Sequence, residues 1–388
     1  MIKKYSLILL LIFTLLVPVI TFGMQPENLQ DFETGGVQDY QEEGFQNYEE
    51  AYAKAIVLSV VEEELDRDLG AGIIENYQRV MIEITSGEFK GKTPIIENNY
   101  ISSPGFEMHV SEGDRILLTV LYDQEGFQTA HIVDFVRDRY IFILGFIFLA
   151  LMVAIGRIKG VKSVISLVVT FLVIYKVMIP QIFNGYNPVL ISVISSVIIA
   201  LLTFLIISGF SKKMVAAFLG TTAGLIIAAL LAMIVSNAAN LTGFGSEEAK
   251  MLYYFPQFSD ANLKGVLLAG IILGALGAVM DVCMSIASSI EEVSAAGEEK
   301  SFKALFTSGM NVGNDIMGTM TNTLVLAYTG ASLPLLLLLM ANDLSFLQVM
   351  NFEMLADEII RALVGTIGLV IAIPITAVIS SVLLRKKA

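Results

Sequence analysis

The sequence contains no tryptophan, one cysteine, two histidines and few charged side chains. Charged residues occupy 16% of the 388 positions, whereas an average soluble domain has about 25%. Cys283 cannot form a disulfide within the chain, and His109 and His131 do not form a zinc-site spacing with it. We interpret both histidines as surface or cross-strand residues rather than ligands, and we expect no metal and no cofactor.

Basic residues are scarcer than acidic ones. There are 24 Lys and Arg against 37 Asp and Glu, which gives a net charge of −13 and argues against a nucleic-acid partner. The sequence also has no phosphate-binding loop and no nucleophile motif. We therefore do not expect this chain to draw energy from a bound nucleotide.

Hydrophobic residues, in contrast, make up 55% of the sequence, and the mean hydropathy is +0.73. They are concentrated in blocks close to or above the roughly 20 residues that cross a bilayer. The sequence predicts an all-α polytopic membrane bundle of seven spans, or eight if the N-terminal hydrophobic segment is retained, with the lipid bilayer as its surroundings. The expected spans are Tyr140–Gly156, Val164–Ile179, Pro188–Phe210, Met214–Val235, Leu263–Ile290, Val312–Met340 and Ala362–Leu384.

Three segments precede this transmembrane helical domain, which we place at residues 139–388. Residues 1–23 resemble a signal peptide or a signal anchor, and residues 24–52 are acidic and lack Lys and Arg, which predicts a disordered linker. Residues 53–138 contain short β-branched runs between turn residues and predict a small β domain, an OB-like barrel. Its expected strands are Ala55–Glu62, Arg79–Ser86, Lys92–Glu97, Arg115–Tyr122 and Ala130–Val136.

Basic residues alternate between the two ends of consecutive spans. Lysines and arginines follow the first, third, fifth and last spans, while the intervening loops contain only Lys250, with Lys264 and Arg361 at span edges. The positive-inside rule therefore predicts a plasma-membrane protein with an extracytoplasmic β domain and a cytoplasmic C-terminus. In this topology Asp281 and Asp315 lie at similar depths.

These two carboxylates are the most informative residues, because each lies in an expected span. Intramembrane Asp residues usually face the bundle interior, a partner or water. Each belongs to a stripe of small and polar residues at steps of three and four, which places them on one helix face. The first stripe comprises Gly270, Gly274, Gly277, Asp281, Met284 or Ser285, and Ser288, and the second comprises Asn311, Asp315, Gly318 or Thr319, Asn322 and Thr329.

Small residues let membrane helices approach closely, and Ser, Thr and Asn then form hydrogen bonds across the contact. We therefore expect the two stripes to face one another, with glycines 270, 274, 277 and 318 at the contact. Gly220 and Gly224 have the same spacing and predict a second packing seam. A structural interpretation stays open for both acids: Asp281 could fix helix register, and Asp315 could cap the start of a helix.

The two motifs resemble a known family. Residues 274–289, GALGAVMDVCMSIASS, and residues 309–330, GMNVGNDIMGTMTNTLVLAYTG, are similar to those of the YibE/F-like multi-pass membrane proteins of Gram-positive and related bacteria. The resemblance covers most of the chain, including the N-terminal domain and the order of the spans. It implies a membrane location and this architecture, and it implies no particular activity.

Three functions are compatible with these residues. The first is transport of a small polar solute or cation along Asp281, Asp315, Ser285, Ser288, Thr319 and Asn322. The second is a non-catalytic envelope component whose outer β domain binds a partner, with a homo-oligomer also possible. The third is an intramembrane aspartyl hydrolase, although Asn314 precedes Asp315 where such proteases have glycine. We favour transport and a protein that is not an enzyme.

Overall fold

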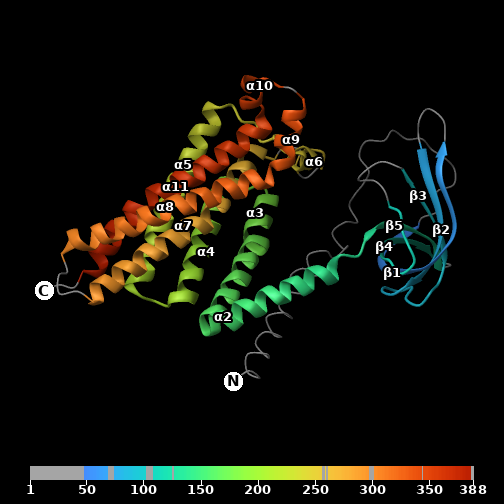
Figure 1. Cartoon of the computed structure of the whole chain (residues 1–388), viewed down its shortest axis with the longest axis horizontal. Helices are drawn as coiled ribbons and strands as arrows, with labels where there is room; N and C mark the ends of the chain where they lie inside the picture. The colour runs from blue at the N-terminus through green and yellow to red at the C-terminus, as the bar shows by residue number, and fades with distance from the viewer. Residues whose placement is uncertain are drawn as a thin grey trace. The chain divides into compact units, whose positions relative to one another are not determined.

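A computed structural model describes residues 48–68, 74–101, 108–124, 126–255, 258, 261–296, 301–342 and 344–385. The expected signal segment and most of the expected acidic linker lie outside these residues. The chain forms two compact units that meet within one helix, between Phe148 and Leu149. The first unit contains a β sheet, and the second contains a helical bundle (Figure 1).

The first unit is a nearly closed sheet of five antiparallel strands in the order β3-β2-β1-β4-β5. Alternate residues of its strands face one interior, as in β4, where Ile116, Leu118 and Val120 are fully buried and their neighbours are not. The expected small barrel is therefore confirmed. The strands are β1 Glu49–Asp68, β2 Ile74–Ile84, β3 Ile95–Ile101, β4 Arg115–Asp123 and β5 Gly126–Phe135.

The strand bounds correct two expectations. β1 begins at Glu49 and pairs with β4 from that residue onward, so the last four residues of the expected linker 24–52 are strand. β1 also extends to Asp68, beyond the expected end at Glu62. Its apolar alternation is interrupted by the acidic run Glu62–Glu64, but cross-strand pairing with β2 continues through two register shifts there.

The second unit consists of long apolar helices. Five are long and apolar enough to cross a membrane, or six if the bent pair α8 and α9 counts as one span, among the residues that the structure describes. The helical elements are α2 Asp138–Val173, η2 Ile174–Met178, α3 Ile179–Phe183, α4 Pro188–Ser208, α5 Lys212–Ala238, α6 Glu247–Tyr253, α7 Leu263–Ala296, α8 Phe302–Ala331, α9 Leu333–Ala341, α10 Phe346–Met350 and α11 Glu353–Leu384.

The expected total of seven spans requires α2 to cross the membrane twice, with a turn between its two arms. Arg157 has a non-helical backbone, with φ 50° and ψ −125°, and the helix changes direction sharply (Figure 1). A Cβ atom at Gly160 would overlap the carbonyl oxygen of Met152, so the two arms touch beside the turn. The expected spans Tyr140–Gly156 and Val164–Ile179 are these two arms, although they belong to one continuous run of helix from Asp138 to Phe183.

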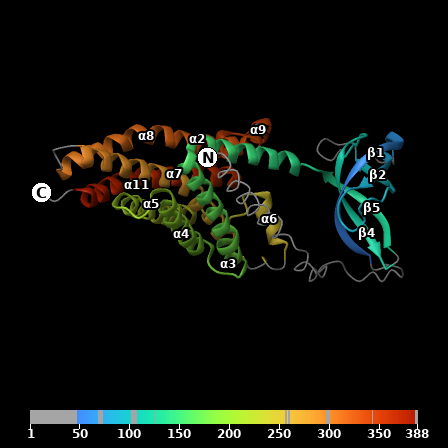
Figure 2. The same cartoon turned by 90° about the horizontal axis from the view of Figure 1, so that it is seen from below.

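The centre of the bundle is formed by α5, α7 and α11, which lie side by side (Figure 2). The expected seam at Gly220 and Gly224 is confirmed, because a Cβ at Gly224 would lie only 2.7 Å from the Ala372 Cβ of α11. Gly368 of α11 makes a reciprocal approach, 2.7 Å from Ala228. Small residues therefore bring α5 and α11 close together.

Two expected spans have different limits in the structure. The segment Val312–Met340 is not one helix: α8 begins at Phe302 and ends at Ala331, and α9 continues at an angle of 60°. Pro334, at the start of α9, lacks the N–H that would continue the preceding helix. The last helix begins at Glu353 rather than Ala362, so residues that we expected in a loop form its first turns.

Candidate functional site

The first stripe lies on the surface of α7. Asp281, Ser285 and all three glycines of the stripe are exposed, whereas Ser288 is half-buried. The opposite face of α7, which includes Val279, Val282 and Ile286, is fully buried in the bundle core. The polar face of α7 is therefore the face that the other described helices leave open.

The glycines of this stripe do not form the contact that the sequence predicts. A Cβ atom at Gly270, Gly277 or Gly318 would meet nothing within 4 Å, whereas one at Gly274 would overlap the hydroxyl oxygen of Tyr328. Of the three glycines on α7, only Gly274 lies against α8. The expected face-to-face packing of the two stripes is therefore wrong for this single chain, because Gly309 and Gly313 of α8, outside the second stripe, lie against Ile290 and Ile286 of α7.

The second stripe is also on a surface. Asp315, Gly318, Thr319 and Asn322 are exposed, and the residues of α8 that face the bundle lie on its other side. Gly313 is one of these, since a Cβ there would overlap Ile373 of α11. The second stripe thus points away from the contact between α8 and α11.

Asp315 does not cap a helix. α8 begins at Phe302, and the Ser301 hydroxyl accepts a hydrogen bond from the Ala304 N–H at 3.2 Å as its N-cap. Asp315 is more than three turns further along, where backbone N–H groups already have partners in the helix. The capping interpretation is wrong, because the helix that contains Asp315 begins well before it, at Phe302.

Neither acid has a counter-charge within the part of the chain that the structure describes. The described ion pairs and hydrogen bonds include neither Asp281 nor Asp315, and none joins the two. Thr319 turns its hydroxyl to the Ile316 carbonyl at 2.9 Å, so part of the stripe's polarity is used within α8. The carboxylates themselves stay available to water, an ion or another chain.

The bundle interior contains polar groups that sequence reasoning missed. Hydroxyls of Ser195, Ser196 and Ser380 are buried and have no hydrogen-bond partner among the described residues. Thr376 lies 3.1 Å from the Cys283 sulfur and donates to the Ala372 carbonyl. A serine or threonine in an apolar run can bond to its own helix, so nothing in the local pattern indicates that these side chains would meet.

A buried acid at the start of α11 was also missed. Asp357 is 5% exposed, and its Oδ1 atom has no hydrogen-bond partner in the described chain. The sequence predicts a loop here, because Asp357 precedes the expected last span Ala362–Leu384. The spacing of Glu353, Asp357 and Arg361 at four-residue intervals is the signal that could have shown a helix face.

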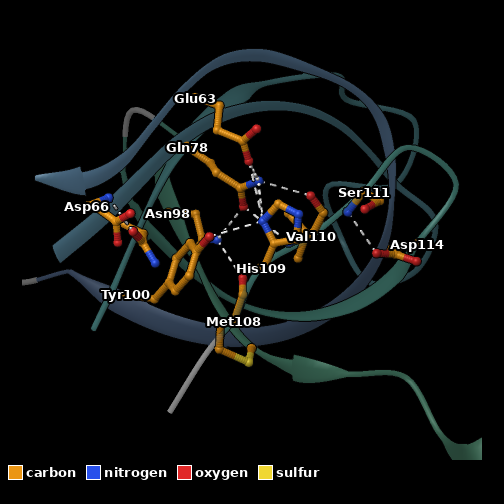
Figure 3. Close-up of polar contacts among 11 residues, drawn as sticks. Glu63, Asp66, Gln78, Asn98, Tyr100, Met108, His109, Val110, Ser111 and Asp114 are labelled. Carbon is orange, nitrogen blue, oxygen red and sulfur yellow. Dashed lines mark hydrogen bonds and ion pairs between the residues drawn. The ribbon is translucent and has the colours of Figure 1, made fainter. Parts of the chain in front are cut away.

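The β domain contains a separate polar network around His109 (Figure 3). The His109 Nδ1 atom lies 3.0 Å from the Tyr100 hydroxyl, 3.0 Å from Gln78 Nε2 and 3.3 Å from Glu63 Oε1. Gln78 is fully buried and also accepts from the Val110 N–H at 3.1 Å. These contacts tie the chain before β4 to β1, β2 and β3. The described residues hold no cluster of three or more potential metal ligands.

Comparison with known proteins gives two matches, both to family models. The model described as YibE/F-like protein matches residues 144–386, and the model described as YibE/F family N-terminal domain matches residues 46–135. Together they cover the helical unit, the β sheet and most of the chain. No curated protein and no solved structure matches.

Proposed function

The chain belongs to the YibE/F-like family, and from this premise and the exposed carboxylates of α7 and α8 we propose that it is a transporter or permease for a small polar solute or cation. The protein is an integral membrane protein with several helices able to cross the bilayer. The proposal concerns what passes along them. It rests on one observation, the two polar stripes on the open faces of α7 and α8.

The two carboxylates need polar surroundings within the membrane. A charged carboxylate facing lipid near the centre of a bilayer costs at least a few kcal/mol, roughly 2.5–3.5 on insertion scales. Asp281 and Asp315 are both exposed in the single chain. Their faces therefore need water, a bound cation, or a second copy of the chain, and each of these surroundings suits a hydrophilic pathway. A catalytic pair sharing one proton would need the carboxylates in contact, and no such contact joins them in the described residues.

The loop charges also suggest an orientation of the chain in the membrane. We propose that the β domain is extracytoplasmic and the C-terminus cytoplasmic in the plasma membrane, because basic residues gather at alternate ends of the helices. Protease added to intact cells should then remove the β domain and leave a C-terminal tag intact.

Flux into proteoliposomes tests the proposal. Vesicles loaded with a pH-sensitive dye are exposed to gradients of Na⁺, K⁺ or methylammonium, and internal pH is followed for the wild type, Asp281→Asn, Asp315→Asn and the double variant. We expect a cation-dependent signal that the double variant loses. Glu247→Gln is the matched control, because Glu247 is an exposed acid paired with Lys250 at 2.7 Å. Equal flux in the double variant, or no flux above empty vesicles for any cation, would refute transport.

A further inference from the structure

We propose that a pocket at the N-terminal end of α11 binds a small organic ammonium ion, with the Asp357 carboxylate as its counter-charge. The pocket has a volume of about 210 Å³. It is lined by the start of α11, by α6 and the chain before it, and by the first turns of α7. It contains neither Asp281 nor Asp315, so binding here and transport along the stripes can fail separately.

Asp357 is the group that points to a ligand. Its side chain is 95% buried, and none of the described hydrogen bonds or ion pairs uses either of its oxygens. A buried carboxylate without a partner costs several kcal/mol. The fold accepts this cost at one wall of a cavity, where a cation could offset it.

The neighbouring charges are already occupied. Glu353 accepts hydrogen bonds from the backbone N–H groups of Thr242 at 2.6 Å and Gly243 at 3.2 Å. Glu358 pairs with Arg361, whose Nη1 lies 3.3 Å from its Oε1. Of these four charged side chains on α11, Asp357 alone makes no hydrogen bond or ion pair among the described residues.

The backbone around the pocket is built to admit this carboxylate. A Cβ atom at Gly245 would overlap the Asp357 Oδ2 atom, so any larger residue there would displace the acid. Glu353 holds the loop in place by binding the preceding residues Thr242 and Gly243. The loop after α5 and the first turn of α11, more than 100 residues apart in sequence, therefore form one wall.

The other walls select the kind of cation. Leu252, Leu263, Val266 and Leu267 give the pocket apolar walls, and its polar lining comprises Ser246, Glu248, Glu358 and Arg361 besides Asp357. The described chain has no group of three metal-ligating residues. The volume equals about seven water molecules at roughly 30 Å³ each. The lining contains three carboxylates and one guanidinium, so it is net negative, and an ammonium group carrying a short alkyl chain fits both this charge and the apolar walls.

The pocket also includes Gly270, the first residue of the first stripe. A cation held at Asp357 would therefore lie at one end of the polar face that continues along α7 to Asp281.

Binding to the purified full chain in detergent tests this site, with propylammonium chloride as the probe. We expect propylammonium to raise the thermal unfolding midpoint, since a ligand that binds only the folded state stabilises it. Sodium chloride at equal ionic strength should not raise the midpoint, because sodium lacks the alkyl chain. 1-Propanol should not raise it either, because it lacks the positive charge. Calorimetry should show at least tenfold weaker binding to Asp357→Asn and unchanged binding to Glu247→Gln.

A second variant keeps the test decisive if Asp357→Asn does not fold. Gly245→Ala retains the carboxylate but takes its space, and it should weaken propylammonium binding by a similar factor, whereas Gly277→Ala, which faces open space, should bind as the wild type does. Stabilisation by propylammonium no greater than by sodium chloride would overturn the proposal. Wild-type affinity in folded Asp357→Asn or in Gly245→Ala would do the same.

Discussion

Replacing Gln78 by Leu should destabilise the β domain more than any other single change in its polar network. Gln78 is fully buried. Its amide donates to the Val110 carbonyl at 3.1 Å and to Glu63 at 2.8 Å, and its carbonyl accepts from the Val110 N–H at 3.1 Å and from Asn98 at 3.2 Å. Leucine has nearly the same volume and supplies none of these contacts.

The magnitude follows from what is left behind. Val110 is fully buried and Asn98 is 6% exposed, so the two backbone groups of Val110 lose a partner that water cannot replace. Each buried group left unsatisfied costs about 1–3 kcal/mol, and the added apolar burial of Leu returns about 1–2 kcal/mol. The net loss should be about 2–4 kcal/mol, a large part of the roughly 5–15 kcal/mol that holds a domain folded.

Hydrogen exchange of the full chain, measured by mass spectrometry, reports the loss of stability separately for each segment. Peptides covering β2 and residues 108–114 should exchange about 30-fold to 1,000-fold faster, since about 1.4 kcal/mol is a factor of ten. Peptides of α5 and α7 should not change. Gln128→Leu is the matched control, because Gln128 lies at an exposed site where it donates to Asp123, and the change should shift exchange by less than about threefold. Exchange of β2 within threefold of wild type in Gln78→Leu would refute the reasoning.

Two further predictions concern the helical seam and an exposed acid. Gly224→Ala should lower the unfolding midpoint in detergent by about 2–10 °C, because the new Cβ would lie 2.7 Å from Ala372 and 3.2 Å from the Gly368 carbonyl. Gly277→Ala is the control and should leave the midpoint unchanged. A midpoint of Gly224→Ala equal to that of Gly277→Ala would contradict the tight packing at this seam. Arg137 and the Phe135 N–H hold the pKa of the Asp134 carboxyl below its ordinary value, so this group stabilises the fold above about pH 4 and the contribution is lost as the pH falls through the lower, folded pKa. Asp134→Asn should therefore speed hydrogen exchange of β5 at pH 7. At pH 3 the exchange rates of the variant and the wild type should lie closer together. A ratio of the two rates that stays constant with pH would show that the carboxylate's charge plays no part.

Local patterns in the sequence were enough to predict the two kinds of unit. The strands β2 and β4 follow from alternation of apolar residues, because a strand buries every second side chain. The membrane helices follow from the length of the apolar runs, because a bilayer has a set thickness. The seam at Gly220 and Gly224 was also predictable, since a four-residue spacing puts both residues on one face of a helix.

Helix limits were harder to predict where polar residues continue a helix beyond its apolar run. α8 begins ten residues before Val312, and α11 begins nine residues before Ala362. The first turns of α11 mix charged residues with apolar ones, and those of α8 mix polar residues with Phe302, Leu305 and Phe306. Such turns satisfy their backbone hydrogen bonds within the helix, which requires no continuous apolar run.

Tertiary structure alone decided where the polar faces point. Periodicity placed Asp281 and Asp315 each on a stripe, but it could not show which neighbours would cover that stripe, because this depends on how several helices pack around it. The same holds for Asp357, whose burial is produced by Gly245 and α6, more than 100 residues earlier in the chain. The sequence by itself determined a membrane bundle with a β domain and two acidic helix faces, and packing between distant segments determined which acid became buried and which two stayed exposed.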